Sequence, residues 1–183
     1  MTDLPPQNPP ALYQIEDFIN KKYAEESHYV SARPSEIRLT FAPHVFDVPD
    51  IRNEPDLAAV MMPFRAEFDA TYETIRRACE SSSLRCLRAD DIWEESTIIQ
   101  DVFNLLLRAR IVIVDFSGKN SNVMYETGIA HTLGKLVVPI SRSPRGDVPF
   151  DLAHHRVLNY LPNSEGLAAL EEKLSEKLRT AAG

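Results

Sequence analysis

The sequence predicts an α/β protein in which helices cover both faces of a parallel β-sheet. From residue 56 onward, short apolar runs alternate with longer segments in which apolar residues recur every three or four positions. The short runs are typical of strands and the longer spacing is typical of helices. The runs are continuously apolar, as in Ile111–Asp115, which indicates strands that are buried on both faces. Together these two observations predict the fold class.

The first 55 residues are expected to form a segment appended to this domain. Residues 1–10 hold four of the 13 prolines and suit an extended or disordered lead. Further prolines divide the rest into short pieces. The predicted domains are therefore 1–55 and 56–183. The elements expected in the appended segment are a helix over 11–27 and extended pieces over Ile37–Phe41 and Val45–Val48.

In the α/β domain, each expected element has its own signal. Helical spacing is clearest between Phe68 and Cys79, and turn residues such as Gly134 end the helices. The expected strands are Asp56–Met62, Leu84–Arg88, Ile111–Asp115, Leu136–Ile140 and Val157–Leu161. The expected helices are Ala66–Ser81, Thr97–Arg108, Val123–Leu133 and Glu165–Thr180.

Five strands connected in this way predict a flavodoxin-like, doubly wound sheet of order 2-1-3-4-5, with the N-terminal segment appended to it. In that order the chain changes direction between the first and third strands, and ligands bind at their carboxyl ends. Those ends are Met62-Pro63-Phe64 and Asp115–Asn122. Receiver domains share this order and an Asp at the position of Asp115. They also need an acidic pair after the first strand, and the chain has none there.

Glu126 is the residue that points most directly to function. At about 100° per helical residue, it lies on the same face as Val123 and Ala130. Burying a carboxylate without a partner is costly. We expect the free N–H groups and the dipole of a first helical turn to lower that cost and keep Glu126 ionised. The alternative is that Glu126 only complements the helix dipole.

Asp101 is the second carboxylate of interest. It falls at the border between the apolar and polar sides of the helix expected over Thr97–Arg108, so it either faces the site or belongs to a solvated surface. That helix is apolar over more than half of its circumference, which indicates deep burial or a subunit interface. We therefore expect a homodimer or a larger homo-oligomer.

Composition and missing motifs exclude several classes of function. The net charge of −7 argues against nucleic-acid and anionic-membrane surfaces. No run approaches 18 apolar residues, and the N-terminus lacks the apolar region of a signal peptide, so we expect a soluble cytoplasmic protein. No GxxxxGK[ST], GxGxxG or GxSxG motif occurs, and the pair His154-His155 lacks a third ligand. No metal or cofactor is expected, and Cys79 and Cys86 are expected to be free thiols.

Three motifs together resemble the nucleoside 2-deoxyribosyltransferase superfamily, which includes nucleoside 5′-monophosphate N-glycosidases and TIR-like relatives. They are Met62-Pro63-Phe64, Ile98-x-x-Asp101 and Asn120-x-Asn122-Val123-x-Tyr125-Glu126-x-Gly128-x-Ala130. The resemblance implies a flavodoxin-like fold and cleavage of an N-glycosidic bond. It further implies that Glu126 is the nucleophile, and that Asp101 orients the substrate or helps to protonate the departing base.

The sequence thus predicts an N-glycosidase or base-exchange glycosyltransferase that acts on a nucleoside, nucleotide or NAD-like dinucleotide. The alternative is a non-catalytic or conditionally active, TIR-like nucleotide-sensing module, which a pocket filled by Phe64 or Tyr125 would favour. A phosphate is expected at the free N–H groups of Ser117–Asn122. The expected substrate-binding residues are Met62, Pro63, Phe64, Asp115, Ser117, Gly118, Asn120, Ser121, Asn122 and Tyr125.

Overall fold

The structure is a computed structural model that describes residues 45–50, 52–92, 97–142, 146–148, 152 and 156–182. The described residues all belong to a compact unit that begins at Pro43. The helix predicted over 11–27 and the piece predicted over Ile37–Phe41 lie outside the described residues. Val45–Val48 is described and forms no strand.

A five-stranded sheet of order β2-β1-β3-β4-β5 forms the centre of this unit, and every pairing in it is parallel. The predicted flavodoxin-like fold class and strand order are therefore confirmed. The strands are β1 Glu54–Met61, β2 Arg85–Arg88, β3 Ala109–Asp115, β4 Leu136–Ser141 and β5 Leu158–Asn159. The helices are α2 Asp69–Glu80, α3 Ile98–Arg108, α4 Ser121–Thr132 and α5 Ser164–Ala182.

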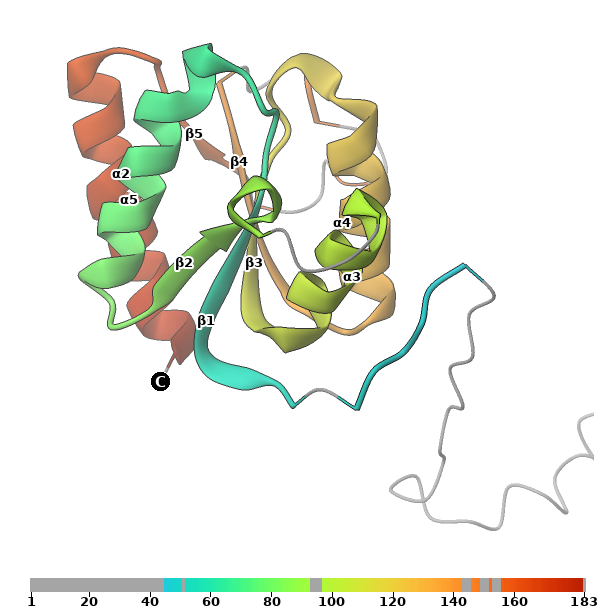
Figure 1. Ribbon diagram of the computed structural model, residues 1–183. Helices are drawn as coiled ribbons and strands as arrows, with labels where there is room; N and C mark the ends of the chain where they lie inside the picture. Colours follow the sequence, from blue (N-terminus) through green and yellow to red (C-terminus); the bar gives the residue numbers. More distant parts are fainter. Residues whose placement is uncertain are drawn as a thin grey trace, which may run out of the picture. The chain divides into compact units, whose positions relative to one another are not determined.

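Each face of the sheet carries two helices (Figure 1). Alternate residues of β1 point to opposite faces. Ala58 and Val60 pack with α2 and α5 in one apolar core, whereas Ala59 and Met61 pack with α3 and α4 in the other. The side chains of both cores are close to fully buried. The two-sided burial explains why Leu57–Met61 of β1 and Ile111–Val114 of β3 are continuously apolar.

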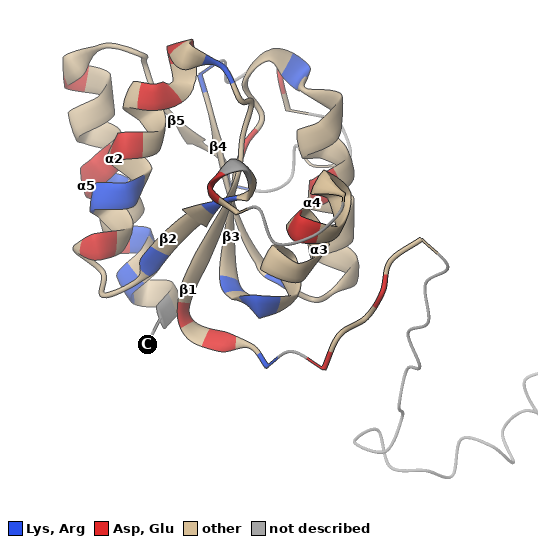
Figure 2. Ribbon diagram, viewed as in Figure 1, with Lys and Arg blue, Asp and Glu red and all other residues tan. Residues whose placement is uncertain are grey.

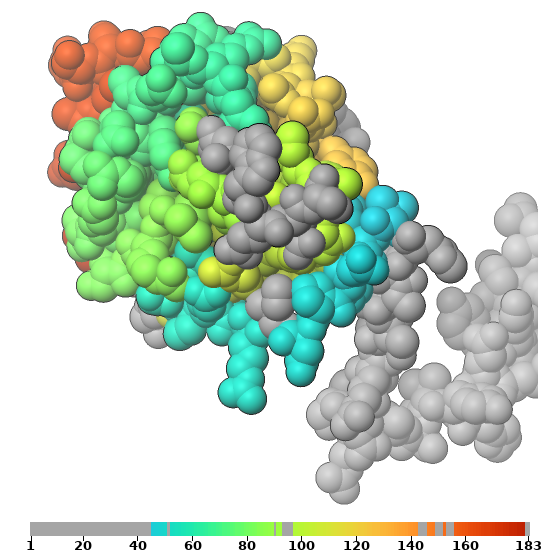
Figure 3. Space-filling view, in the orientation of Figure 1, coloured from blue at the N-terminus to red at the C-terminus, as the bar shows by residue number. Residues whose placement is uncertain are grey.

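The outer side of α3 is covered by residues of its own chain. The ring of Phe46 stacks on that of Phe103, with centroids 4.4 Å apart and planes 3° from parallel. Gln100 exchanges two hydrogen bonds with the backbone of Asp47. In Figure 3 the segment 45–50 (cyan) lies against α3 (lime). Part of the predicted appended segment thus packs on the α/β unit, and much of the apolar circumference that suggested a subunit interface is buried within the chain.

Charges at the amino-terminal edge of the sheet pair with one another. Arg85 bridges Glu54 and Asp56, and Arg108 also bonds Glu54 at 2.6 Å. Basic and acidic segments accordingly lie side by side at the starts of β1, β2 and β3 (Figure 2). Lys135 donates to the carbonyls of residues 107 and 109, where α3 ends and its carbonyls lack helical partners. The charged side chains at this amino-terminal edge are thus paired with one another, so the functional site is expected at the opposite, carboxyl edge of the sheet.

Two further expectations concern cysteine and membrane spans. Cys79 and Cys86 are free thiols, as predicted, and contact with Cys79 together with burial raises the pKa of the Cys86 thiol. None of the helices in the described part of the chain is long and apolar enough to span a bilayer.

Candidate functional site

Glu126 lies in the second turn of α4 and is only 7% exposed. It shares the buried face of α4 with Val123 and Ala130, as the helical spacing predicted. None of the described residues donates a hydrogen bond to its carboxylate, and burial alone raises its pKa from 4.5 to about 7. The side chain is therefore a desolvated acid that is close to half-protonated at neutral pH.

The expectation that Glu126 occupies a first helical turn, and is kept ionised there, is wrong. α4 begins at Ser121, with Asn120 as its N-cap. The side-chain oxygen of Asn120 accepts hydrogen bonds from the N–H groups of Asn122 and Val123, at 2.9 and 3.3 Å. The helical donors are thus satisfied one turn before Glu126, and the dipole effect falls off within that first turn.

Asp101 is buried at 5% exposure in the first turn of α3, so the alternative of a solvated helix face is excluded. α3 and α4 contact each other and cover the same face of the sheet. Both helices start at its carboxyl edge. The fold therefore brings the two carboxylates to one face and one edge, at the switch point between β1 and β3.

Three N–H groups of the loop between β3 and α4, which were expected to be free for a phosphate, have acceptors within the protein. The N–H and the hydroxyl of Ser117 both donate to Oδ1 of Asp115. The N–H of Gly118 donates to Oδ2 of Asp147 at 3.0 Å, and that of Lys119 donates to the carbonyl of Phe116. These three donors and the N–H groups capped by Asn120 are therefore occupied, one of them by a carboxylate from the segment that follows β4.

Asp115 is fully buried at the end of β3 and holds this loop in place rather than facing open solvent. Burial raises the pKa of its carboxyl, while hydrogen bonds from Ser117 and Tyr160 act in the opposite direction. Tyr160 donates to Oδ2 of Asp115 at 2.6 Å and accepts from Nε of Arg142 at 3.1 Å. The Arg142 guanidinium also stacks on the Phe68 ring, 3.8 Å from its centroid. This network connects the ends of β3, β4 and β5 to the start of α2.

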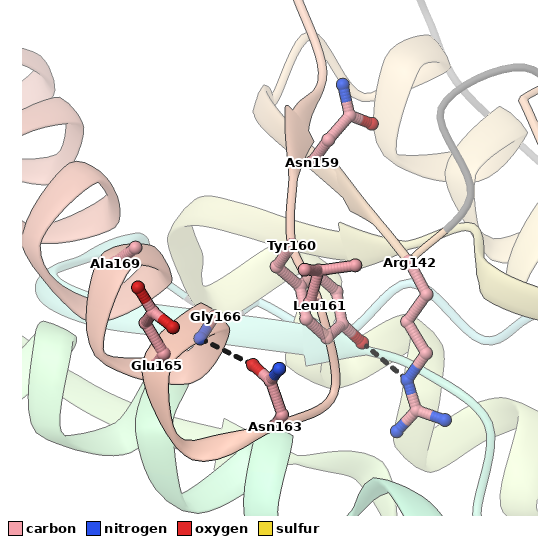
Figure 4. A pocket seen from close by; sticks show the side chains of 8 residues that line it. All are labelled: Arg142, Asn159, Tyr160, Leu161, Asn163, Glu165, Gly166 and Ala169. Atoms are coloured by element: carbon pink, nitrogen blue, oxygen red, sulfur yellow. Dashed lines mark hydrogen bonds between the residues drawn. The ribbon is translucent and has the colours of Figure 1, made fainter.

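A cavity of about 400 Å³ lies beside this network, between β5 and the start of α5. Figure 4 shows Tyr160 turned towards Arg142, with Asn163 holding the N–H of Gly166 on the other side. Neither Glu126 nor Asp101 lines it. Arg142 and Tyr160, and likewise Asn163 and the N–H of Gly166, are bonded to each other in its wall. We place the reactive chemistry at Glu126, whose buried carboxylate has no such partner among the described residues.

The remaining residues that were predicted to bind substrate differ in how exposed they are. Met62 and Pro63 are buried, and Met62 packs in the core shared with α2 and α5. Phe64 is 49% exposed and Tyr125, on α4, is 53% exposed. Neither aromatic ring is buried, so neither fills a pocket. Ser121 and Asn122 are exposed at the start of α4.

Sequence reasoning missed three residues of this edge: Arg142, Tyr160 and Asp147. Arg142 directly follows β4 and Tyr160 directly follows β5, so the rule that ligand sites lie at carboxyl ends of strands could have found both. Asp147 has no comparable signal, because it does not follow directly on a strand or a helix. Within the described part of the chain no three acidic, His or Cys side chains could hold a metal ion, and His154 and His155 lie outside it.

Comparisons with known proteins place the fold. Neither a protein-family model nor a curated protein sequence matches the chain. A similar solved structure is a 2-desoxiribosyltransferase from Leishmania mexicana, with a TM-score of 0.46 and 18% identity over 64% of this chain and 98% of that one. Another is a metazoan TIR-STING receptor from C. gigas in complex with 2′,3′-cGAMP, with a TM-score of 0.50 and 19% identity over 74% of this chain.

The chain shares its fold with the TIR-STING receptor. It spans 42% of that protein's length, and the identity is too low to carry more than the fold. Function therefore has to be argued from the residues at the carboxyl edge.

Proposed function

We propose that this protein cleaves the N-glycosidic bond of a nucleoside-type substrate, with Glu126 as nucleophile and Asp101 as the group that orients and protonates the departing base. The observation that carries the proposal is the environment of Glu126. A carboxylate held on a buried helix face at the switch point, without a hydrogen-bond donor among the described residues, is destabilising for the fold. Such strain concentrates at functional sites.

The proposed chemistry needs two acids with different roles. A Glu126 oxygen attacks C1′ of the sugar as the bond from C1′ to the base nitrogen breaks, and the electron pair of that bond leaves with the base. Asp101 supplies the proton that the base takes up. Water then displaces Glu126 in a hydrolase, or a second base displaces it in a transferase. The developing positive charge on the sugar is stabilised by a carboxylate in a desolvated site.

The raised pKa of Glu126 gives the reaction a defined pH dependence. A nucleophilic carboxylate must be ionised, and the pKa of Glu126 in the free protein is about 7. We therefore expect kcat/KM to rise with pH up to about pH 7 and then to level off, unless a second group limits the alkaline side. A rate that is flat between about pH 5 and pH 8 contradicts the assignment.

The decisive experiment is incubation of the purified protein with a panel of ribonucleosides, deoxyribonucleosides, their 5′-monophosphates and NAD, followed by chromatographic detection of free base. Glu126→Ala should abolish base release, and Glu126→Gln should do the same while preserving side-chain volume. Glu172→Gln, which removes an exposed charge on α5, is the matched control and should keep full activity. Full activity of the folded Glu126→Ala variant would rule out the nucleophile.

Asp101→Asn separates binding from proton transfer. An amide keeps hydrogen bonds to a ligand but supplies no carboxylic proton, so turnover should fall by at least about tenfold while calorimetric binding survives. Unchanged turnover would show that Asp101 has no catalytic role. Binding of a panel member without release of base from the wild-type protein would favour the nucleotide-sensing alternative.

A further inference from the structure

The β3–α4 loop carries its own negative charges at the place where a phosphate would otherwise bind. Gly118 adopts a left-handed backbone conformation, with φ at 74°, which glycine adopts without strain. That N–H is bonded to the carboxylate of Asp147, from the chain segment that follows β4. The Asp147 carboxylate thus occupies the position at this loop where an anion would otherwise bind.

The neighbouring donors are occupied in the same way. Asp115 takes both donors of Ser117, and Asn120 takes two N–H groups of α4. Ser117 has no spare donor, because its hydroxyl donates to Asp115 and accepts from the N–H of Arg142. A phosphate at this loop would displace these bonds and would also lie beside two carboxylates.

The guanidinium of Arg142 already has partners within the protein. It donates to Tyr160 and to the carbonyl of Glu67 and stacks on the Phe68 ring, and its charge acts on buried Asp115, whose pKa it lowers. Lys119 is exposed at the loop. Glu126 and Asp101 add two more acids on the same face of the sheet. Like charges at short range repel strongly where water is partly excluded.

We propose that Asp147 is a specificity-determining residue that excludes phosphate from the β3–α4 loop, so that the site selects nucleosides over nucleoside 5′-monophosphates. The inference rests on the proposed function for the identity of the ligand. The exclusion itself is a property of Asp147 and Gly118. It reverses the expectation, drawn from the sequence, that this loop binds a phosphate.

Inorganic phosphate tests the exclusion without any need for catalysis. The amide resonance of Gly118 is followed by NMR during a phosphate titration of the wild-type protein, Asp147→Asn and Asp147→Ala. Asparagine keeps an oxygen acceptor for the Gly118 N–H and removes the charge, whereas alanine removes both. We expect no saturable shift in the wild type. In Asp147→Ala we expect a saturable shift of the Gly118 resonance, with an apparent Kd for phosphate at least about tenfold lower than any wild-type value. In Asp147→Asn we expect the Kd for phosphate to fall by less than in Asp147→Ala.

Two results would overturn the proposal: a saturable phosphate shift at Gly118 in the wild type, or no phosphate binding in either folded variant. Glu172→Gln changes the net charge equally and should behave as the wild type. A second experiment measures the competitive binding of 2′-deoxyadenosine and its 5′-monophosphate to the protein. In the wild type, the nucleoside should bind with a Kd at least about tenfold lower than that of its 5′-monophosphate. In Asp147→Ala the ratio of the two Kd values should be smaller. If neither compound binds, the proposed function fails while the phosphate titration still decides the role of Asp147.

Discussion

Replacing Glu126 with Gln should stabilise the protein, and the gain should depend on pH. The carboxyl has a pKa of about 7 in the folded protein, against 4.5 when it is fully solvated. Each pKa unit corresponds to about 1.36 kcal/mol, so the full difference amounts to about 3 kcal/mol. Gln has a similar volume and no charge to desolvate, so the variant is free of this penalty.

The sign follows from the protons that each state binds. Below about pH 4.5 the carboxyl is protonated in both states, and Glu126 brings no charge penalty. Between about pH 4.5 and pH 7 the unfolded chain releases the proton while the folded protein keeps it, so the free energy of unfolding falls as pH rises. Above about pH 7 the whole penalty is present, and there the Gln variant should exceed the wild type by about 3 kcal/mol.

Urea unfolding of both proteins at several pH values between about 5 and 9 measures this difference. Subtracting the two curves removes the contributions of all other titrating groups, which the variants share. Glu172→Gln, an exposed acid on α5, should show a difference close to zero throughout. A difference between wild type and Glu126→Gln that stays constant across this range would refute the reasoning, because it would mean that Glu126 titrates normally in the folded state.

Three other predictions concern packing, the loop network and assembly. Phe46→Ala should lower the free energy of unfolding by roughly 2 kcal/mol, about half of a fully buried Phe truncation, in chemical denaturation. Val45→Ala, at a position 73% exposed, should have almost no effect. Tyr160→Phe removes the hydroxyl that donates to buried Asp115 and should cost about 1–3 kcal/mol, and an unchanged denaturation midpoint would contradict this. A homodimer stays a prediction, because Ile98 is still 67% exposed on α3, and light scattering that returns the monomer mass at micromolar concentration would rule it out.

The strands and helices could be predicted because their signals are local. A strand buried on both faces is apolar over its buried positions, and β3 shows this in Ile111–Val114 and β4 in Leu136–Ile140. The ends of elements were less certain. β5 is only two residues long, where Val157–Leu161 had been expected, and the predicted helix over Ala66–Ser81 begins with a 3-10 turn at Ala66–Phe68. Such ends depend on neighbouring loops rather than on the element's own pattern.

The buried position of Glu126 could also be read from helical spacing, but its protonation could not. The spacing places the residue on the face with Val123, and the structure agrees. Its pKa depends on which donors reach the carboxylate, and Asn120 already uses the N–H groups at the start of α4. The helix was expected over Val123–Leu133, whereas α4 begins at Ser121. The earlier start places Glu126 in the second turn, beyond the donors that were expected to stabilise its charge.

By itself, the sequence predicted the order of the sheet, the switch point at its carboxyl edge and the helix face that buries Glu126. These follow from the apolar pattern of the strands and helices and from their alternation along the chain. The sequence left the burial of Asp101 open, and the tertiary structure decided it. Only the tertiary structure decided what fills the β3–α4 loop. Asp147 is 29 residues from Gly118, and Tyr160 is 45 residues from Asp115. Contacts between such distant polar side chains arise where separate loops meet at one edge of the sheet, and no local pattern encodes that meeting.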